Sequence, residues 1–289
     1  MKAVLQKSTI PASKIFVVQH LKDKHFDPYL HSHAECQLFV PLSGTGTRFI
    51  GDNISAFKPG VLTLTGANLP HLWRSDEAYF KKNSSLSTSG IVIYFNENFL
   101  GDHLMEKEEM LLLKKLLDNS KRGIDFFGET RNRVIQMMEE LTGLHGIKSV
   151  IHLLEILNLL AFTKEYQYIS SVMPRDVFHQ RENDRLNQVY TFVLKNFSRK
   201  IALAELADLV YMTPTSFSRY FTMHNNKTFS SFVTEIRVKH ACKLLTETDD
   251  AISQISFESG FDTLSNFNKQ FKEFTGKRPM EYKKEYMSI

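Results

Sequence analysis

Short hydrophobic runs separated by turn residues dominate the first hundred positions of the chain. β-branched and aromatic residues are concentrated in five runs, with glycine, proline, asparagine and aspartate between them: residues 15–19, 37–42, 47–51, 61–65 and 91–95. Several short strands joined by such turns are typical of a small antiparallel barrel or sandwich. The pattern therefore predicts a β-rich N-terminal domain.

The spacing of hydrophobic positions changes to three and four from about residue 105. It predicts helices over 105–117, 134–144 and 148–168, and the last of these is apolar on most sides. Such a helix needs partners on several faces, either inside the domain or across a dimer interface. Periodicity is lost over 170–184, which contains Pro174 and many charges, and we expect a linker there.

An internal repeat with an offset of 49–50 residues occupies the rest of the chain. Each copy has an apolar anchor, a threonine and two phenylalanines four apart: Leu206, Thr213, Phe217 and Phe221, then Ile255, Thr263, Phe267 and Phe271. A repeat of this length usually reflects one supersecondary unit used twice. Each copy predicts a short helix, a tight turn and a second helix that the threonine opens. The turn of the second copy contains Gly260, where a positive φ is inexpensive.

The second helix of each copy is predicted to bury its phenylalanines and to present polar side chains on the opposite face. Those side chains are Thr215, Ser218 and Arg219 in one copy, and Ser265, Asn266 and Lys269 in the other. A buried stripe behind a polar face is the arrangement of a recognition helix. Residues 229–247 between the copies fit one helix of roughly 28 Å, against about 34 Å between successive major grooves.

Over about residues 183–287 the chain resembles the AraC/XylS family of transcription regulators. The stretches that carry the resemblance are LAELADLVYMTPTSFSRYF, TEIRVKHACKLL, ISQISFESGF and FNKQFKEFTGKRPMEYKK. It implies a sequence-specific transcription regulator whose all-α C-terminal domain holds two helix-turn-helix units joined by a long helix. It also implies contacts with double-stranded DNA from these residues: Thr215, Ser216, Ser218, Arg219, Ser265, Asn266 and Lys269.

Three sites depart from the family pattern. Ala202 stands where a Ser or Thr cap is common, which predicts a frayed helix start. Asn226 replaces a glycine, and asparagine tolerates the left-handed conformation that the turn needs. Thr222 and Met223 stand where basic residues are common, which predicts that the first unit grips phosphates less tightly than the second.

The N-terminal domain contains His31-Ser32-His33 before a strand and His71 after a turn. The pattern resembles a cupin barrel, whose metal-binding members use an HxH pair, a carboxylate and a later histidine. Gln37 stands at the carboxylate position, and Glu35 on the same side of the strand is a candidate substitute. A metal site, including that of a metal-dependent enzyme fused to a DNA-binding tail, is therefore one interpretation.

The interpretation that we favour is a pocket for a small-molecule effector, with no metal and no cofactor. Its candidate wall residues are Gln37, Phe39, Arg48, His71 and Trp73. The predicted organisation is a cupin-like barrel over 1–105, a helical dimerisation segment packed on it over 106–169, the linker over 170–184 and the DNA-binding domain over 185–289. The family implies a homodimer; a barrel that only dimerises and binds no effector is a third hypothesis.

Charge and composition add little to this interpretation. The net charge is +4, of which +3 lies in residues 183–289, and this mild asymmetry favours an anionic partner. Cys36 and Cys242 have no metal-binding spacing and are expected to stay reduced. We expect a cytoplasmic protein, because no secretory signal or membrane-spanning stretch is recognisable. The motifs GxSxG and HExxH and a phosphate-binding glycine loop do not occur, so we expect no enzyme.

Overall fold

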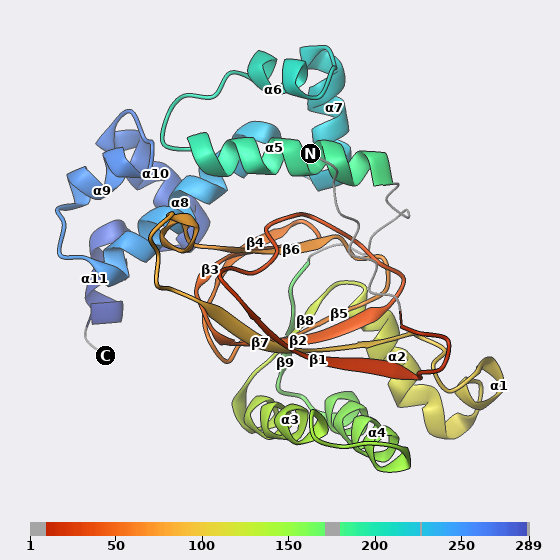
Figure 1. Ribbon diagram of the computed structural model, residues 1–289. Coiled ribbons are helices and arrows are strands. Elements are labelled where there is room, and N and C mark those ends of the chain that lie inside the picture. The colour runs from red at the N-terminus through yellow and green to blue at the C-terminus, as the bar shows by residue number, and fades with distance from the viewer. Residues whose placement is uncertain (1–9, 171–179, 226, 288–289) are drawn as a thin grey trace. The chain divides into compact units, whose positions relative to one another are not determined.

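The computed structural model describes residues 10–170, 180–225 and 227–287. The chain divides into two compact units, Met1–Asn183 and Asp184–Ile289, which are described separately (Figure 1). Most of the predicted linker, residues 171–179, lies outside the described residues. Helix α5 (Gln180–Asn196) begins inside the range that the loss of periodicity assigned to that linker.

The described strands of the first unit form two antiparallel sheets. The larger has the order β1-β7-β2-β5-β8-β9 and the smaller has the order β4-β3-β6. The strands are β1 (Phe16–Asp23), β2 (Cys36–Ser43), β3 (Gly46–Ile50), β4 (Asn53–Phe57), β5 (Leu62–Thr65), β6 (His71–Ser75), β7 (Thr88–Phe95), β8 (Ile124–Phe126) and β9 (Tyr166–Tyr168). A sheet-rich N-terminal region is thus confirmed, and no single closed barrel is found among these strands.

Strand β2 shows how the unit is layered. Leu38 and Val40 pack on one face of the larger sheet with the helices, whereas Phe39 packs on the other face, against the smaller sheet. A strand that is buried on both faces reads as a continuous apolar run, as β2 does. The helices are α1 (Asp102–Met105), α2 (Leu111–Ser120), α3 (Gly128–Leu141) and α4 (Ile147–Phe162).

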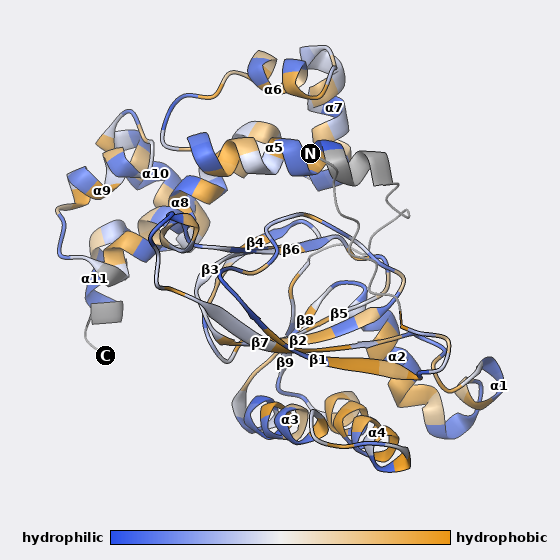
Figure 2. Ribbon diagram, in the orientation of Figure 1, coloured by the Kyte–Doolittle hydropathy of each residue, from blue (hydrophilic) through white to orange (hydrophobic). Residues whose placement is uncertain are grey.

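Helix α4 is hydrophobic on most of its surface (Figure 2). Its inner face buries Leu153, Ile156 and Leu157 in the core under the larger sheet. The helix predicted over 148–168 is wrong in its last turns, because α4 ends at Phe162 and the chain then forms β9 beside β8. No helix in the described ranges is both long and apolar enough to cross a membrane.

The second unit is helical throughout its described residues. Its helices are α5 (Gln180–Asn196), α6 (Leu203–Leu209), α7 (Pro214–Asn225), α8 (Phe229–Glu247), α9 (Ile252–Glu258), α10 (Leu264–Thr275) and α11 (Pro279–Met287). Helix α8 packs against α7, α9, α10 and α11. Its bounds equal the predicted ones, and Thr228 caps its start by accepting from the Ser231 N–H at 3.2 Å.

Candidate nucleic-acid interface and cavity of the first unit

The two copies of the repeat have the same backbone connection between their helices. In α6–α7 the Met212 N–H donates to the Ala207 carbonyl at 2.8 Å, and in α9–α10 the Phe261 N–H donates to the Ser256 carbonyl at 3.1 Å. The residue before each donor has a positive φ, 57° at Tyr211 and 84° at Gly260. Two helix-turn-helix units of one geometry are therefore present.

Threonine opens the second helix of each unit, as predicted. The Thr213 hydroxyl accepts from the Ser216 N–H and the Thr263 hydroxyl accepts from the Asn266 N–H, both at 3.2 Å. Each bond satisfies one of the donors that a helix start leaves without an intrahelical partner. The position of the predicted turn residue Asn226 lies outside the described residues.

The start of α6 is capped in a way that sequence analysis missed. Ala202 has no side-chain cap, but the Glu205 carboxylate accepts from the Ala202 N–H at 2.8 Å. Arg199 pairs with the same carboxylate at 2.9 Å. The Arg199 guanidinium and then the Ala202 N–H lower the pKa of Glu205. The frayed start expected from Ala202 is thus not what the structure shows.

The inner face of each recognition helix lies in its own aromatic core. Phe217 and Phe221 of α7 are fully buried, and the Phe221 ring meets the Phe232 ring of α8 at a centroid distance of 5.1 Å. The equivalent pair of α10 is buried to the same degree: Phe267 and Phe271.

The core behind α10 is closed by helices α8 and α11. The Phe271 ring meets the Tyr282 ring of α11 at a centroid distance of 5.5 Å. Val238, Ala241 and Leu245 of α8 are buried in the same cluster. Helix α8 thus contributes to the cores of both helix-turn-helix units and connects them rigidly.

The outer faces of α7 and α10 carry the residues predicted to contact DNA. All seven are exposed: Thr215, Ser216, Ser218, Arg219, Ser265, Asn266 and Lys269. Arg219 and Lys269 occupy equivalent positions, 50 residues apart, and neither forms an ion pair within the described residues. By contrast, Lys227 and Lys239 both pair with Glu235, at 2.8 and 2.6 Å.

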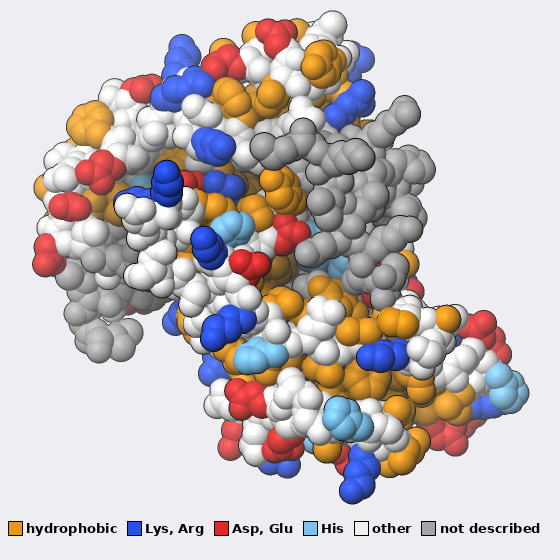
Figure 3. All heavy atoms as spheres, in the orientation of Figure 1, with side chains coloured by type: hydrophobic (Ala, Val, Ile, Leu, Met, Phe, Trp, Pro, Cys, Tyr) orange, Lys and Arg blue, Asp and Glu red, His pale blue; other side chains and the backbone are white. Residues whose placement is uncertain are grey.

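Sequence analysis missed one residue on this face. Asn268 is exposed and lies 50 residues after Ser218, so the repeat itself contained the signal. An asparagine amide offers both a donor and an acceptor to a base edge. In the view of Figure 3, Lys and Arg side chains lie among polar and apolar side chains.

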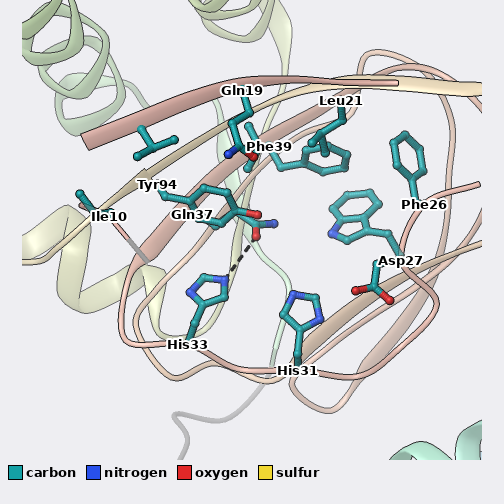
Figure 4. A pocket seen from close by; sticks show the side chains of 13 residues that line it. Ile10, Gln19, Leu21, Phe26, Asp27, His31, His33, Gln37, Phe39 and Tyr94 are labelled. Carbon is teal, nitrogen blue, oxygen red and sulfur yellow. Dashed lines mark hydrogen bonds between the residues drawn. The ribbon is translucent and has the colours of Figure 1, made fainter. Parts of the chain in front are cut away.

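A cavity of about 380 Å³ lies in the first unit, between its two sheets. Aromatic and aliphatic side chains line one part of it, and polar side chains line another (Figure 4). Its lining residues are Ile10, Val17, Gln19, Leu21, Phe26, Asp27, His31, His33, Gln37, Phe39, Trp73, Val92 and Tyr94. Burial, with the Asp27 and Glu35 carboxylates, raises the pKa of Tyr94 to about 12, which keeps its hydroxyl protonated.

The five predicted effector residues lie in different surroundings. Gln37, Phe39 and Trp73 line the cavity, whereas His71 is buried behind its wall. Arg48 does not line the cavity: its guanidinium forms a buried ion pair with Asp125. Asp27, Gln19 and Tyr94 were not predicted, since their convergence depends on strand pairing, such as Gln37 opposite Tyr94, that local patterns do not reveal.

Three histidines cluster at the polar end of the cavity. One ring nitrogen of each lies within 4.8 Å of those of the other two: His31, His33 and His71. Figure 4 shows His31 and His33 side by side, with Gln37 across from them. The Gln37 Oε1 atom lies 3.4 Å from His33 Nε2 and 3.2 Å from His71 Nε2. Burial lowers the pKa of His33 and His71, which favours neutral rings.

Comparison with known proteins bears on the second unit. Residues 206–285 match the family described as "Helix-turn-helix domain". An HTH-type transcriptional regulator of Staphylococcus aureus strain MSSA476 is 32% identical over 101 residues, which are 35% of this chain and 14% of that protein. One of Haemophilus influenzae is 25% identical over 139 residues, 48% of this chain and 46% of that protein.

A solved structure, fatty-acid-bound ToxT from Vibrio cholerae, covers 95% of this chain and 96% of its own, with 17% identity and a TM-score of 0.37. This chain spans only 14% of the length of the staphylococcal relative. The second unit is a helix-turn-helix domain. Helix α8 joins its two helix-turn-helix units.

Proposed function

We propose that the chain is a sequence-specific DNA-binding transcription regulator of the AraC type, which acts through binding and not through catalysis. One observation carries the proposal: two units of the same geometry expose polar faces with Arg219 and Lys269 at equivalent positions. Arginine and lysine bind guanine O6 and N7 in the major groove, and asparagine binds adenine. Asn266 and Asn268 supply that second chemistry.

The length of α8 supports the recognition of two neighbouring groove segments on one duplex. Its 19 residues extend roughly 28 Å at 1.5 Å per residue. Successive major grooves on one face are about 34 Å apart. Because α8 packs against α7 and α10, we expect it to hold the two recognition helices at a spacing that suits neighbouring groove segments.

The cavity of the first unit is the proposed effector site. No Lys or Arg is among its lining residues, while Asp27 is, so an uncharged or cationic small molecule fits better than an anion. The Trp73 Nε1 atom is buried and has no hydrogen-bond partner in the described residues. An acceptor on the effector would satisfy it.

A homodimer through α4 completes the proposal. Ile147, Ile151 and Phe162 of α4 are 72%, 50% and 66% exposed. Large apolar side chains on one helix face are typical of protein interfaces. Two protomers would bring four recognition helices to a target with repeated half-sites.

Selection of sites from a random DNA pool by the full chain tests the proposed function. We expect enrichment of one sequence, bound at least about a thousandfold more tightly than random DNA. The matched control is the double variant Arg219→Ala/Lys269→Ala, which should enrich no site. Equal binding of selected and random DNA by the unaltered chain would contradict the proposal.

A further inference from the structure

One part of the cavity wall in the first unit is aromatic. The Phe26 and Phe39 rings meet edge to face at a centroid distance of 5.4 Å, and the Phe39 and Trp73 rings meet in the same way at 4.7 Å. All three residues line the cavity, whose volume of about 380 Å³ is at the lower end of the range for small-molecule sites. Aromatic rings pack against other rings and attract organic cations to their faces. The cavity therefore suits a small ligand with a ring.

One acidic side chain lines the same cavity. Asp27 is partly buried, and in Figure 4 Asp27 and His31 lie on one side of the cavity while Phe26 and Phe39 lie on another. Asp27 accepts from the Tyr29 N–H at 3.0 Å, but it forms no ion pair within the described residues. No Lys or Arg is among the described residues that line the cavity. A carboxylate and aromatic rings around one space favour a cationic ligand.

The polar atoms of the cavity wall determine which hydrogen bonds a ligand can form. His31 Nδ1 faces the Tyr29 carbonyl at 2.8 Å, and because a carbonyl only accepts, the Nε2 atom of the neutral ring is an acceptor. With the Asp27 carboxylate, it favours a ligand that has several N–H donors. Trp73 Nε1 has the opposite character, since it is a buried donor without a hydrogen-bond partner in the described residues. It favours an oxygen acceptor on the same ligand.

We propose that the cavity binds a small aromatic primary amine as a cation. Its ammonium group donates to the Asp27 carboxylate and to His31 Nε2, and its ring packs against the aromatic wall. An oxygen on the ring accepts from Trp73 Nε1. A quaternary ammonium ion has no N–H to donate, and an acid would bring a second negative charge to Asp27. This inference rests on the proposed effector site and narrows its ligand to one chemical class.

Calorimetric titration of the full chain without DNA, using four compounds that share a phenol ring, tests the inference. Tyramine carries an ammonium group, tyrosol a hydroxyl in its place, 4-hydroxyphenylacetate a carboxylate, and free tyrosine both an ammonium and a carboxylate. We expect tyramine to bind more tightly than each of the others by about tenfold or more. The compound 2-phenylethylamine lacks the phenol oxygen and should bind more weakly than tyramine.

Variants assign these preferences to single side chains. Asp27→Asn keeps an oxygen that can accept from the Tyr29 N–H but removes the charge, so it should weaken tyramine binding about tenfold or more and leave tyrosol binding nearly unchanged. Asp23→Asn alters an exposed carboxylate of β1 outside the cavity; it is the matched control and should change neither. Trp73→Phe should abolish the difference between tyramine and 2-phenylethylamine.

The outcomes separate this inference from the proposals on which it rests. Tyrosol or 4-hydroxyphenylacetate bound as tightly as tyramine would overturn the inference and leave the effector site in place. No binding of any of the compounds would overturn the inference and count against the effector site as well. Neither result bears on DNA binding, which the selection of sites tests separately.

Discussion

Arg219 and Lys269 are the residues on which specific recognition is expected to depend. Each projects from the exposed face of a recognition helix, and neither is neutralised by an acidic partner in the described residues. Replacing either by alanine should weaken binding to the selected site by roughly 1–3 kcal/mol and alter the preferred sequence. Fluorescence anisotropy measures both effects. Lys114→Ala, an exposed lysine of α2, should leave affinity unchanged.

The buried pair of Arg48 and Asp125 is a second residue-scale feature. The Arg48 guanidinium also donates to Thr63 at 2.7 Å and to Ser55 at 2.9 Å. Asp125→Ala leaves the buried guanidinium without its counter-charge and should lower the free energy of unfolding by about 3–5 kcal/mol. Urea titration followed by fluorescence of Trp73, the single tryptophan, reports this unit.

The control for that experiment removes both charges. Arg48→Met combined with Asp125→Leu should lie closer to the unaltered chain than Asp125→Ala does, because no unpaired charge remains buried. A double variant less stable than the single one would show that the pair itself, with its hydroxyl partners, is what stabilises the sheets.

At the scale of elements, the two turns give a matched test of backbone strain. Gly260 has a φ of 84°, and a Cβ there would lie 2.5 Å from the Phe197 carbonyl oxygen. Gly260→Ala should therefore lower the free energy of unfolding of the C-terminal helical half of the chain by more than about 1 kcal/mol. Tyr211 has a φ of 57° and is 93% exposed, so Tyr211→Gly should change stability by less than about 1 kcal/mol. Thermal unfolding followed by circular dichroism compares them.

Local patterns predicted long elements better than short ones. Helix α8 was predicted residue for residue from its apolar positions, and the structure adds the cap at Thr228. Strand β6 was not predicted, because three of the five residues of His71–Ser75 are polar although all are buried, so the strand shows neither an apolar run nor an alternation. The three-residue strands β8 and β9 exist through their pairing with distant strands, which a local pattern does not encode.

The same limit applies to the sites. The exposed faces of α7 and α10 follow from helical period alone, and the structure exposes every residue predicted there. The cavity instead depends on residues brought together by sheet register and loops, such as Asp27 and Tyr94. Arg48 illustrates the converse. The alternation of side chains along its strand predicted that it faces the pocket, but it pairs with Asp125, which lies 77 residues away in the sequence.

At the scale of the whole molecule, the exposed face of α4 tests the proposed homodimer. Ile151→Asp places a charge on that face and should convert a dimer into a monomer, because an unpaired charge is costly to bury in an interface. Sedimentation velocity measures the change. Ile15→Asp, at an isoleucine that is 42% exposed outside α4, should leave the dimer intact. A monomeric unaltered chain would contradict the proposal.

Methylation interference on the selected DNA site tests the central claim most directly. Because α8 holds the two recognition helices, methylation should interfere with binding at two groups of major-groove positions. These groups should lie about one helical turn, or 10–10.5 base pairs, apart. Arg219→Ala should lose contacts in one group only, and Lys269→Ala in the other only. A single group of contacts, or the same positions lost in both variants, would contradict the account.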